Sequence, residues 1–156
     1  VYNVLTRSLR KALRKNGYDL VIIDNAPTFN LVTVNSLYAS DEILIPLKLG
    51  IYELDGFVST VKEISNFNDV YSKDIDFKIL ITMMQRGNRP DYKKFVEEIR
   101  YLFPDRVYSS TIGYQDAVVN RTSMKQEFLV NHDSNVGEDY RSLVKELEEE
   151  NMKEAQ

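Results

Sequence analysis

One acidic side chain stands where a sheet protein could do chemistry. Four apolar residues, at positions 20–23, run directly into the carboxylate of Asp24, and Pro27 follows three residues later. A continuous apolar run is typical of a strand buried on both faces of a parallel sheet, and such sheets bind ligands at the carboxyl ends of their strands. A carboxylate there suits a hard cation that bridges phosphate oxygens. The alternative is an Asp that caps the next turn or helix, and the spacing alone leaves both readings open.

The order of elements predicts the sheet that would position this acid. Apolar residues at helical spacing predict helices near 3–16, 31–38, 54–67, 95–103 and 136–147, the last with Asn135 and Glu138 as a capping pair. Apolar runs predict strands at 19–24, 42–46, 77–84 and 106–112. Alternating strands and helices predict an α/β fold with three αβα layers and a mostly parallel sheet. We expect residues 1–150 to form the domain and residues 151–156 to fray.

Composition excludes several classes of protein. The chain has 156 residues, 43% of them hydrophobic and 28% charged, as in ordinary globular domains. It has no Cys and one His, His132, which argues against disulfides, thiolate metal sites and a Ser-His-Asp triad. No apolar run approaches the roughly 20 residues that span a bilayer. The net charge of −4 gives no global attraction to DNA, so DNA binding would need a local basic patch.

Four short motifs around Asp24 resemble one family. The segments "VIIDNAPT" (21–28), "VNSL" (34–37), "ASDEILIP" (39–46) and "YELDG" (52–56) occur in this order. They are similar to the second half of a ParA/Soj-type partition ATPase, of the deviant Walker family that also contains MinD. The resemblance continues to the end of the chain and implies an incomplete P-loop NTPase-like fold of the SIMIBI type.

The resemblance implies roles on the phosphate side of a nucleotide site. Asp24 matches the Walker B acid near Mg²⁺, and Pro27 and Thr28 match the switch segment that senses the γ-phosphate. The plainer alternatives are a strand-ending turn at Pro27 and a helix cap at Thr28.

The base side of that site is matched less completely. Thr82 and Met83 fall where the family's strand end approaches adenine, although a Met there is more often core. Ile112 matches the start of the family's Ile-Pro-Arg loop, but Gly113 and Tyr114 replace Pro and Arg. This replacement weakens the case for base recognition by the loop.

The Gly-rich loop that holds phosphates in the family is missing from this sequence. None of the six Gly residues is followed by Lys, and the family's Asp-x-Asp-Pro-Gln segment is missing too. We therefore expect the chain to be the C-terminal part of a longer ATPase that uses ATP and Mg²⁺. By itself it is expected neither to bind ATP tightly nor to hydrolyse it. The alternative is a natural relative that lost the loop.

DNA binding in the family is non-specific and uses basic residues that contact phosphates. Arg86 and Arg89 lie near one family position. A second family position aligns with Ala117, and Arg121 and Lys125 are close to it in the sequence. The plainer alternative is a solvated charged surface.

The resemblance favours partitioning of plasmid or chromosome by ATP-dependent homodimers. The implied partners are DNA and a ParB-like centromere-binding protein, without a membrane, in a bacterial cytoplasm at the nucleoid. The alternative is a non-catalytic interaction or dimerisation module. A MinD-like membrane role is disfavoured, because the C-terminus is acidic rather than a basic amphipathic helix.

Overall fold

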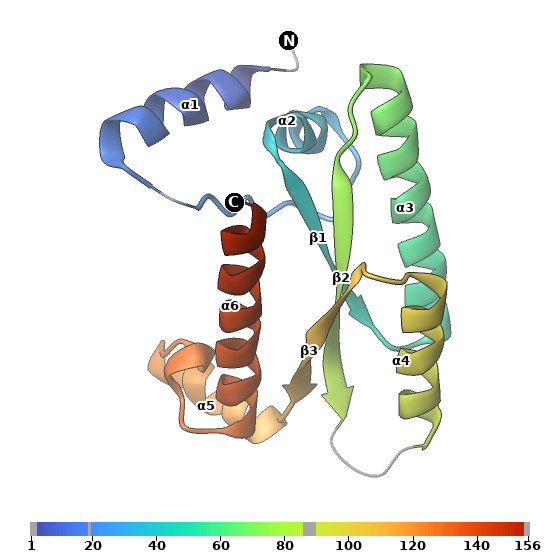
Figure 1. Cartoon of the computed structure of the whole chain (residues 1–156). Helices are drawn as coiled ribbons and strands as arrows, with labels where there is room; N and C mark the ends of the chain where they lie inside the picture. The colour runs from blue at the N-terminus through green and yellow to red at the C-terminus, as the bar shows by residue number, and fades with distance from the viewer. Residues whose placement is uncertain (1–2, 19, 86–89, 155–156) are drawn as a thin grey trace. The chain divides into compact units, whose positions relative to one another are not determined.

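A computed structural model describes residues 3–18, 20–85 and 90–154 (Figure 1). The chain divides into two compact units, residues 1–43 with 58–77 and residues 44–57 with 78–156. In chain order, the elements are α1 (Val4–Asn16), α2 (Leu31–Ala39), β1 (Glu42–Lys48), α3 (Ile51–Tyr71), β2 (Asp76–Gln85), α4 (Pro90–Leu102), β3 (Val107–Tyr114), α5 (Asp116–Lys125), the 3-10 turn η1 (Leu129–Asn131) and α6 (Asn135–Glu154).

The first unit is built around the contact of α2 with the second half of α3. Its core comprises Val34, Leu37, Phe67 and Ile75. Helix α1 also belongs to this unit and packs against α2. It ends at Gly17, whose left-handed backbone (φ 66°) lets its N–H reach the carbonyl of Leu13, a conformation that glycine adopts without steric cost. The predicted helix at 3–16 is therefore confirmed.

The second unit carries the sheet. Its strands lie in the order β1-β2-β3, and β2 runs parallel to β3, with Ile79 opposite Val107 and Met84 opposite Gly113. Figure 1 shows the three arrowheads at the same end of the sheet, with α6 on one face and α4 on the other. The predicted three-layer αβα fold with a parallel sheet is confirmed.

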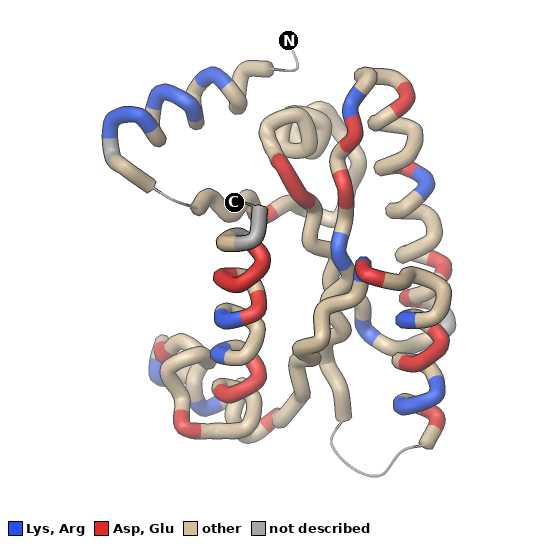
Figure 2. Tube along the Cα trace, viewed as in Figure 1, with Lys and Arg blue, Asp and Glu red and all other residues tan. Residues whose placement is uncertain are grey.

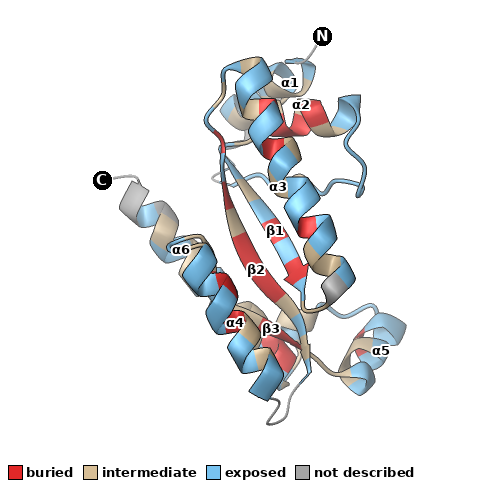
Figure 3. Cartoon of the chain, turned by 90° about the vertical axis from the view of Figure 1, so that its right-hand side faces the viewer, coloured by how far each residue is buried: buried red, intermediate tan, exposed pale blue. Residues whose placement is uncertain are grey.

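Burial is concentrated on the strands and on the helix faces turned toward them (Figure 3). Leu80, Tyr108, Ile112, Val136 and Leu143 form the core between the sheet and α6. The predicted strand at 42–46 is confirmed as β1, which buries Ile45 and Leu47 and exposes the residues directly before and after each of them. One covered face suffices for a strand at the end of the sheet order.

The predicted strand at 19–24 is also wrong for the residues that are described. Asp19 lies outside them, and residues 20–26 have no regular secondary structure. Leu20, Val21 and Ile22 are exposed, Ile22 at 83%. A strand forms only through hydrogen bonds to a neighbouring strand, and no described strand pairs with this segment. Apolar composition alone therefore does not make it a strand.

Further differences concern helices. Helix α5 and η1 were not predicted. Helix α6 is capped by Ser134, whose hydroxyl accepts a hydrogen bond from the Gly137 N–H (3.2 Å). The predicted Asn135 and Glu138 pair does not form the cap, because Glu138 instead bonds Arg141 at 3.0 Å. The described part of α6 runs to Glu154, so residues 151–154 are helical.

Side chains bind three backbone groups of β3 where its pairing with β2 is irregular. The register of β2 and β3 shifts between Ile79 and Ile81, and there the N–H groups of Ser109 and Ser110 both donate to the Glu146 carboxylate, at 2.6 and 2.8 Å. On the same strand, Arg100 donates to the Ser109 carbonyl at 3.1 Å. These contacts give hydrogen-bond partners to backbone groups at the irregularity, and a backbone group left without a partner costs stability where it is shielded from water.

The hydrogen bonds from Ser109 and Ser110 favour the ionised form of the Glu146 carboxyl. Burial alone would raise the pKa of its carboxyl, but hydrogen bonds from Ser110 and Ser109 outweigh burial and hold the pKa below its ordinary value. Such a group stabilises the fold fully above its unfolded-state pKa, about 4.3. That contribution is lost as pH falls through the lower pKa of the folded state.

We predict that Glu146→Gln lowers the free energy of unfolding by about 1 kcal/mol at pH 7, because an amide oxygen replaces two charged acceptors. In urea titrations from pH 7 to pH 3, the difference from wild type shrinks below about pH 4, as the wild-type carboxylate protonates. Glu149→Gln, an exposed change on the same helix, is the control and has little effect. A difference that stays constant down to pH 3 contradicts the assignment.

Candidate functional site

The carboxylate of Asp24 is exposed and has no partner among the described residues. It makes no hydrogen bond or ion pair with any other described residue, so the alternative that it caps the next turn is not seen. Pro27 is exposed as well and lies in a bend. A lone exposed carboxylate fits one ligand position of a hard cation. No group of three or more His, Cys, Asp or Glu residues gathers around a metal position within the described part of the chain.

The segment after Asp24 is held by its own hydrogen bonds. Asn30 caps α2, because its side-chain oxygen accepts from the N–H groups of Val32 (2.8 Å) and Thr33 (3.2 Å). The Asn30 amide donates to the Thr28 hydroxyl (3.0 Å), and the Thr33 hydroxyl donates to the Thr28 carbonyl (2.6 Å). Thr28 is therefore not the helix cap. It is fixed beside the cap, and its hydroxyl proton is still free to donate to an anion.

Strand β2 departs from regular geometry at the two residues expected near adenine. Ile81 pairs with Thr111 and Met84 with Gly113, so β2 has one more residue than β3 between these pairs. The extra residue forms a bulge in which Met83 adopts φ 58°, a left-handed conformation that is uncommon for a residue with a side chain. The Met83 side chain is 44% exposed and is not core, and Thr82 is half-buried.

Ile112, by contrast, is committed to packing. Its side chain is 4% exposed and lies in the core against α6. The N–H of Gly113 donates to Asp139 of α6 at 2.8 Å, and the Tyr114 hydroxyl donates to Asp116, which raises the pKa of Tyr114. Core packing and two carboxylates thus fix the end of β3, so Ile112 can offer a ligand only its backbone.

The basic residues expected to contact DNA are only partly described. Arg86 and Arg89 lie outside the described residues. Arg121 is exposed on α5 and pairs with no described acid. Lys125 lies 3.9 Å from Glu127, and both side chains are largely exposed, so this ion pair is weak.

The residues predicted to form a nucleotide site fall into two groups. Asp24, Pro27 and Thr28 belong to the first unit, whereas Thr82, Met83 and Ile112 belong to the second. Within the first group, hydrogen bonds organise the Thr28 segment, and Asp24 stands four residues before it. Within the second group, the bulge makes Met83 available and the core occupies Ile112.

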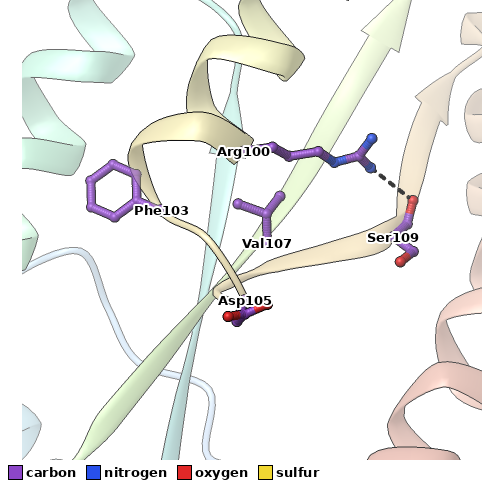
Figure 4. A pocket seen from close by; sticks show the side chains of 5 residues that line it. All are labelled: Arg100, Phe103, Asp105, Val107 and Ser109. Carbon is purple, nitrogen blue, oxygen red and sulfur yellow. Dashed lines mark hydrogen bonds between the residues drawn. The ribbon is translucent and has the colours of Figure 1, made fainter.

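Two hollows were not anticipated. One lies between the end of α4 and β3 and is lined by Arg100, Phe103, Asp105, Val107 and Ser109 (Figure 4). Arg100 crosses it to reach the Ser109 carbonyl, so its guanidinium already has a structural partner. The other hollow lies on α1 and is lined by Arg and Lys side chains alone. Its signal was present in the sequence "RSLRKALRKN", which repeats basic residues at helical spacing.

None of the described helices is both long enough and apolar enough to cross a bilayer.

Known proteins resemble this chain in sequence and in fold. A family model described as "AAA domain" matches residues 2–77. The sporulation initiation inhibitor protein Soj of Bacillus subtilis is 31% identical over 107 residues, which cover 67% of this chain and 42% of that protein. The chromosome partitioning protein ParA of Caulobacter vibrioides is 29% identical over 108 residues, which cover 68% and 40% respectively. The chain thus spans about two fifths of the length of these curated relatives.

A solved structure supports the fold. It is described as a plasmid partition protein of Borrelia burgdorferi B31 bound to AMPPNP, and it matches 91% of this chain and 55% of its own with a TM-score of 0.67 at 17% identity. The parallel sheet between helices is therefore a P-loop NTPase-like αβα fold. The sequence relatives narrow this class, and the chain belongs to the ParA/Soj-type family of partition ATPases.

The strain at Met83 is testable. A left-handed backbone costs an L-residue about 1 kcal/mol, and glycine removes this cost but adds a similar loss through the entropy of the unfolded chain. We predict that Met83→Gly changes the free energy of unfolding by less than about 0.5 kcal/mol. Met84→Gly, at a neighbouring residue with ordinary backbone, is predicted to destabilise by about 1 kcal/mol or more. Equal losses in urea titrations of the two variants would contradict the strain.

Proposed function

We propose that this chain is the Walker B-bearing, C-terminal part of a partition ATPase that segregates plasmid or chromosome DNA. The observation that carries the proposal is the free carboxylate of Asp24, in the segment "VIIDNAPT" of a chain whose relatives are partition proteins. Family membership supports the role. The relatives are longer than this chain, so the activity belongs to the whole protein.

In that protein, Asp24 would supply one ligand to the Mg²⁺ that accompanies ATP. The metal ion would neutralise part of the negative charge on the phosphates. Thr28, fixed beside Asn30, would donate its hydroxyl proton to a phosphate oxygen. Thr82 and Met83 would contact the base at the bulge, and Ile112 would contribute backbone only. The sequence has no Gly followed by Lys to hold the phosphates. The proposal therefore includes that this chain alone neither binds ATP tightly nor hydrolyses it.

The remaining parts of the proposal concern partners. An ATP-dependent homodimer would bind DNA without sequence preference, Arg121 and Lys125 contributing, and would meet a ParB-like protein on the nucleoid of a bacterial cytoplasm. Arg86 and Arg89 are assigned to the same role on their sequence positions alone.

A second candidate is a non-catalytic dimerisation or interaction module of the same fold. In this candidate the chain keeps the fold and a dimer or partner surface and never hydrolyses ATP, because ATP is held mainly by a phosphate-binding loop in such folds. The gene upstream of Val1 separates the two candidates. An in-frame "KGGVGKT"-like loop indicates the ATPase, and its absence indicates the module.

We predict that the purified 156-residue chain shows no ATP turnover, and that Asp24→Asn lowers turnover of the protein with its upstream loop by at least about 100-fold, because the metal loses its anionic ligand. Phosphate release is the measurement. Asp41→Asn, which also removes an exposed carboxylate, serves as the matched control and retains turnover. Turnover by the isolated chain that Asp24→Asn abolishes refutes the prediction that the chain alone is inactive.

A further inference from the structure

Helix α1 concentrates positive charge on one exposed surface. Figure 2 shows Lys and Arg recurring along it, with no Asp or Glu. None of its basic side chains forms an ion pair with a described residue. We call this surface the α1 basic face. It consists of Arg7, Arg10, Lys11, Arg14 and Lys15, which are all exposed and together line one hollow.

The helix does not need this charge for its own stability. Arg14 and Lys15, in the last turn, interact favourably with the negative end of the helix dipole. Arg7 and Arg10 lie too far toward the positive end to gain from it. Like charges three and four residues apart repel, as Arg7 and Lys11 do here. The chain carries −4 overall, so clustering five cations on one helix is a local feature and not a consequence of composition.

The spacing of the cations suits a regular polyanion. Residues 7 to 15 cover about 12 Å of helix at 1.5 Å per residue, and duplex DNA presents one phosphate charge about every 1.7 Å of its axis. Long Arg and Lys side chains on one helix face can therefore reach several phosphates together. Arg forks also fit phosphate oxygens bidentately.

An anionic membrane is the other polyanion to consider. A helix that lies on a membrane buries an exposed apolar face beside its basic face. In α1 the apolar residues Leu5, Leu9 and Leu13 are half-buried, on a helix that packs against α2. The apolar face is thus already in use within the first unit, which favours a ligand that needs charge only.

We propose that the α1 basic face binds the phosphate backbone of duplex DNA without reading its sequence. This inference deepens the DNA-binding part of the proposed function and rests on it, and it adds a contact surface to the one that includes Arg121 and Lys125. Because each phosphate contact releases about 0.9 of a counterion, five contacts make the affinity fall about 500-fold between 50 and 200 mM salt.

The test uses the whole 156-residue chain and a fluorescent 24-base-pair duplex, with binding followed by anisotropy across that salt range. The α1 variant combines Arg7→Gln, Arg10→Gln and Arg14→Gln, which keep helix propensity. It leaves two contacts, so the affinity is expected to fall only about 10-fold across the same range and to be weaker at 50 mM. The control combines Lys62→Gln, Lys93→Gln and Lys94→Gln, three exposed lysines, and keeps the wild-type slope. Circular dichroism confirms that each variant is folded.

Three results would overturn the inference. The first is a control variant that loses as much salt dependence as the α1 variant. The second is binding to vesicles of anionic lipid but not to the duplex. The third is a double variant, Arg121→Gln with Lys125→Gln, that no longer binds the duplex while the α1 variant still does. In that case the protein still binds DNA, as the proposed function requires, but not through α1. Failure of the proposed function would give a different result. The duplex would still bind through α1, but the protein with its upstream residues would hydrolyse no ATP.

Discussion

The need of each strand for partners on its backbone governs this structure. Strand β2 pairs with β3, and at the register shift Glu146 and Arg100 bind backbone groups of Ser109 and Ser110. Where no partner is available, as at residues 20–23, the same kind of apolar sequence has no regular structure. Hydrophobicity selects which segments are drawn inward, but hydrogen bonding decides which of them become strands.

The same constraint explains why some residues of the predicted nucleotide site are held in place and others are not. Thr28 is ordered by a local network with Asn30 and Thr33, which depends on no strand. Asp24 follows the unpaired segment and has no partner in the described chain. Met83 marks the place where β2 breaks its own ladder and turns a side chain outward. Local hydrogen bonds therefore order the Thr28 part of the predicted site, whereas Asp24 follows a segment, residues 20–23, that pairs with no described strand.

Sequence patterns predicted most of the fold, because the periodicity that identifies a helix is a short-range property of the sequence. Leu5, Leu9 and Leu13, for example, recur at helical spacing in α1, and Gly17 follows its last residue. The patterns failed where the outcome depends on distant groups. Nothing near residues 20–23 tells whether a neighbouring strand exists, and nothing near Ile112 tells that α6 covers it. For Met83, the bulge arises from the register between two strands, which no local pattern encodes. The basic cluster on α1, by contrast, is encoded locally, since its Arg and Lys residues recur at helical spacing in the sequence.

The acidic side chains of α6 have a consequence for how that helix is held on the sheet. Glu146 accepts hydrogen bonds from the N–H groups of Ser109 and Ser110, and Asp139, on the same helix, accepts one from the Gly113 N–H. Apolar packing alone carries no direction, whereas these charge-assisted hydrogen bonds require a particular alignment. Glu146 and Asp139 thus set the position of α6 along β3 at two places, so the helix cannot slide on the strand without breaking them.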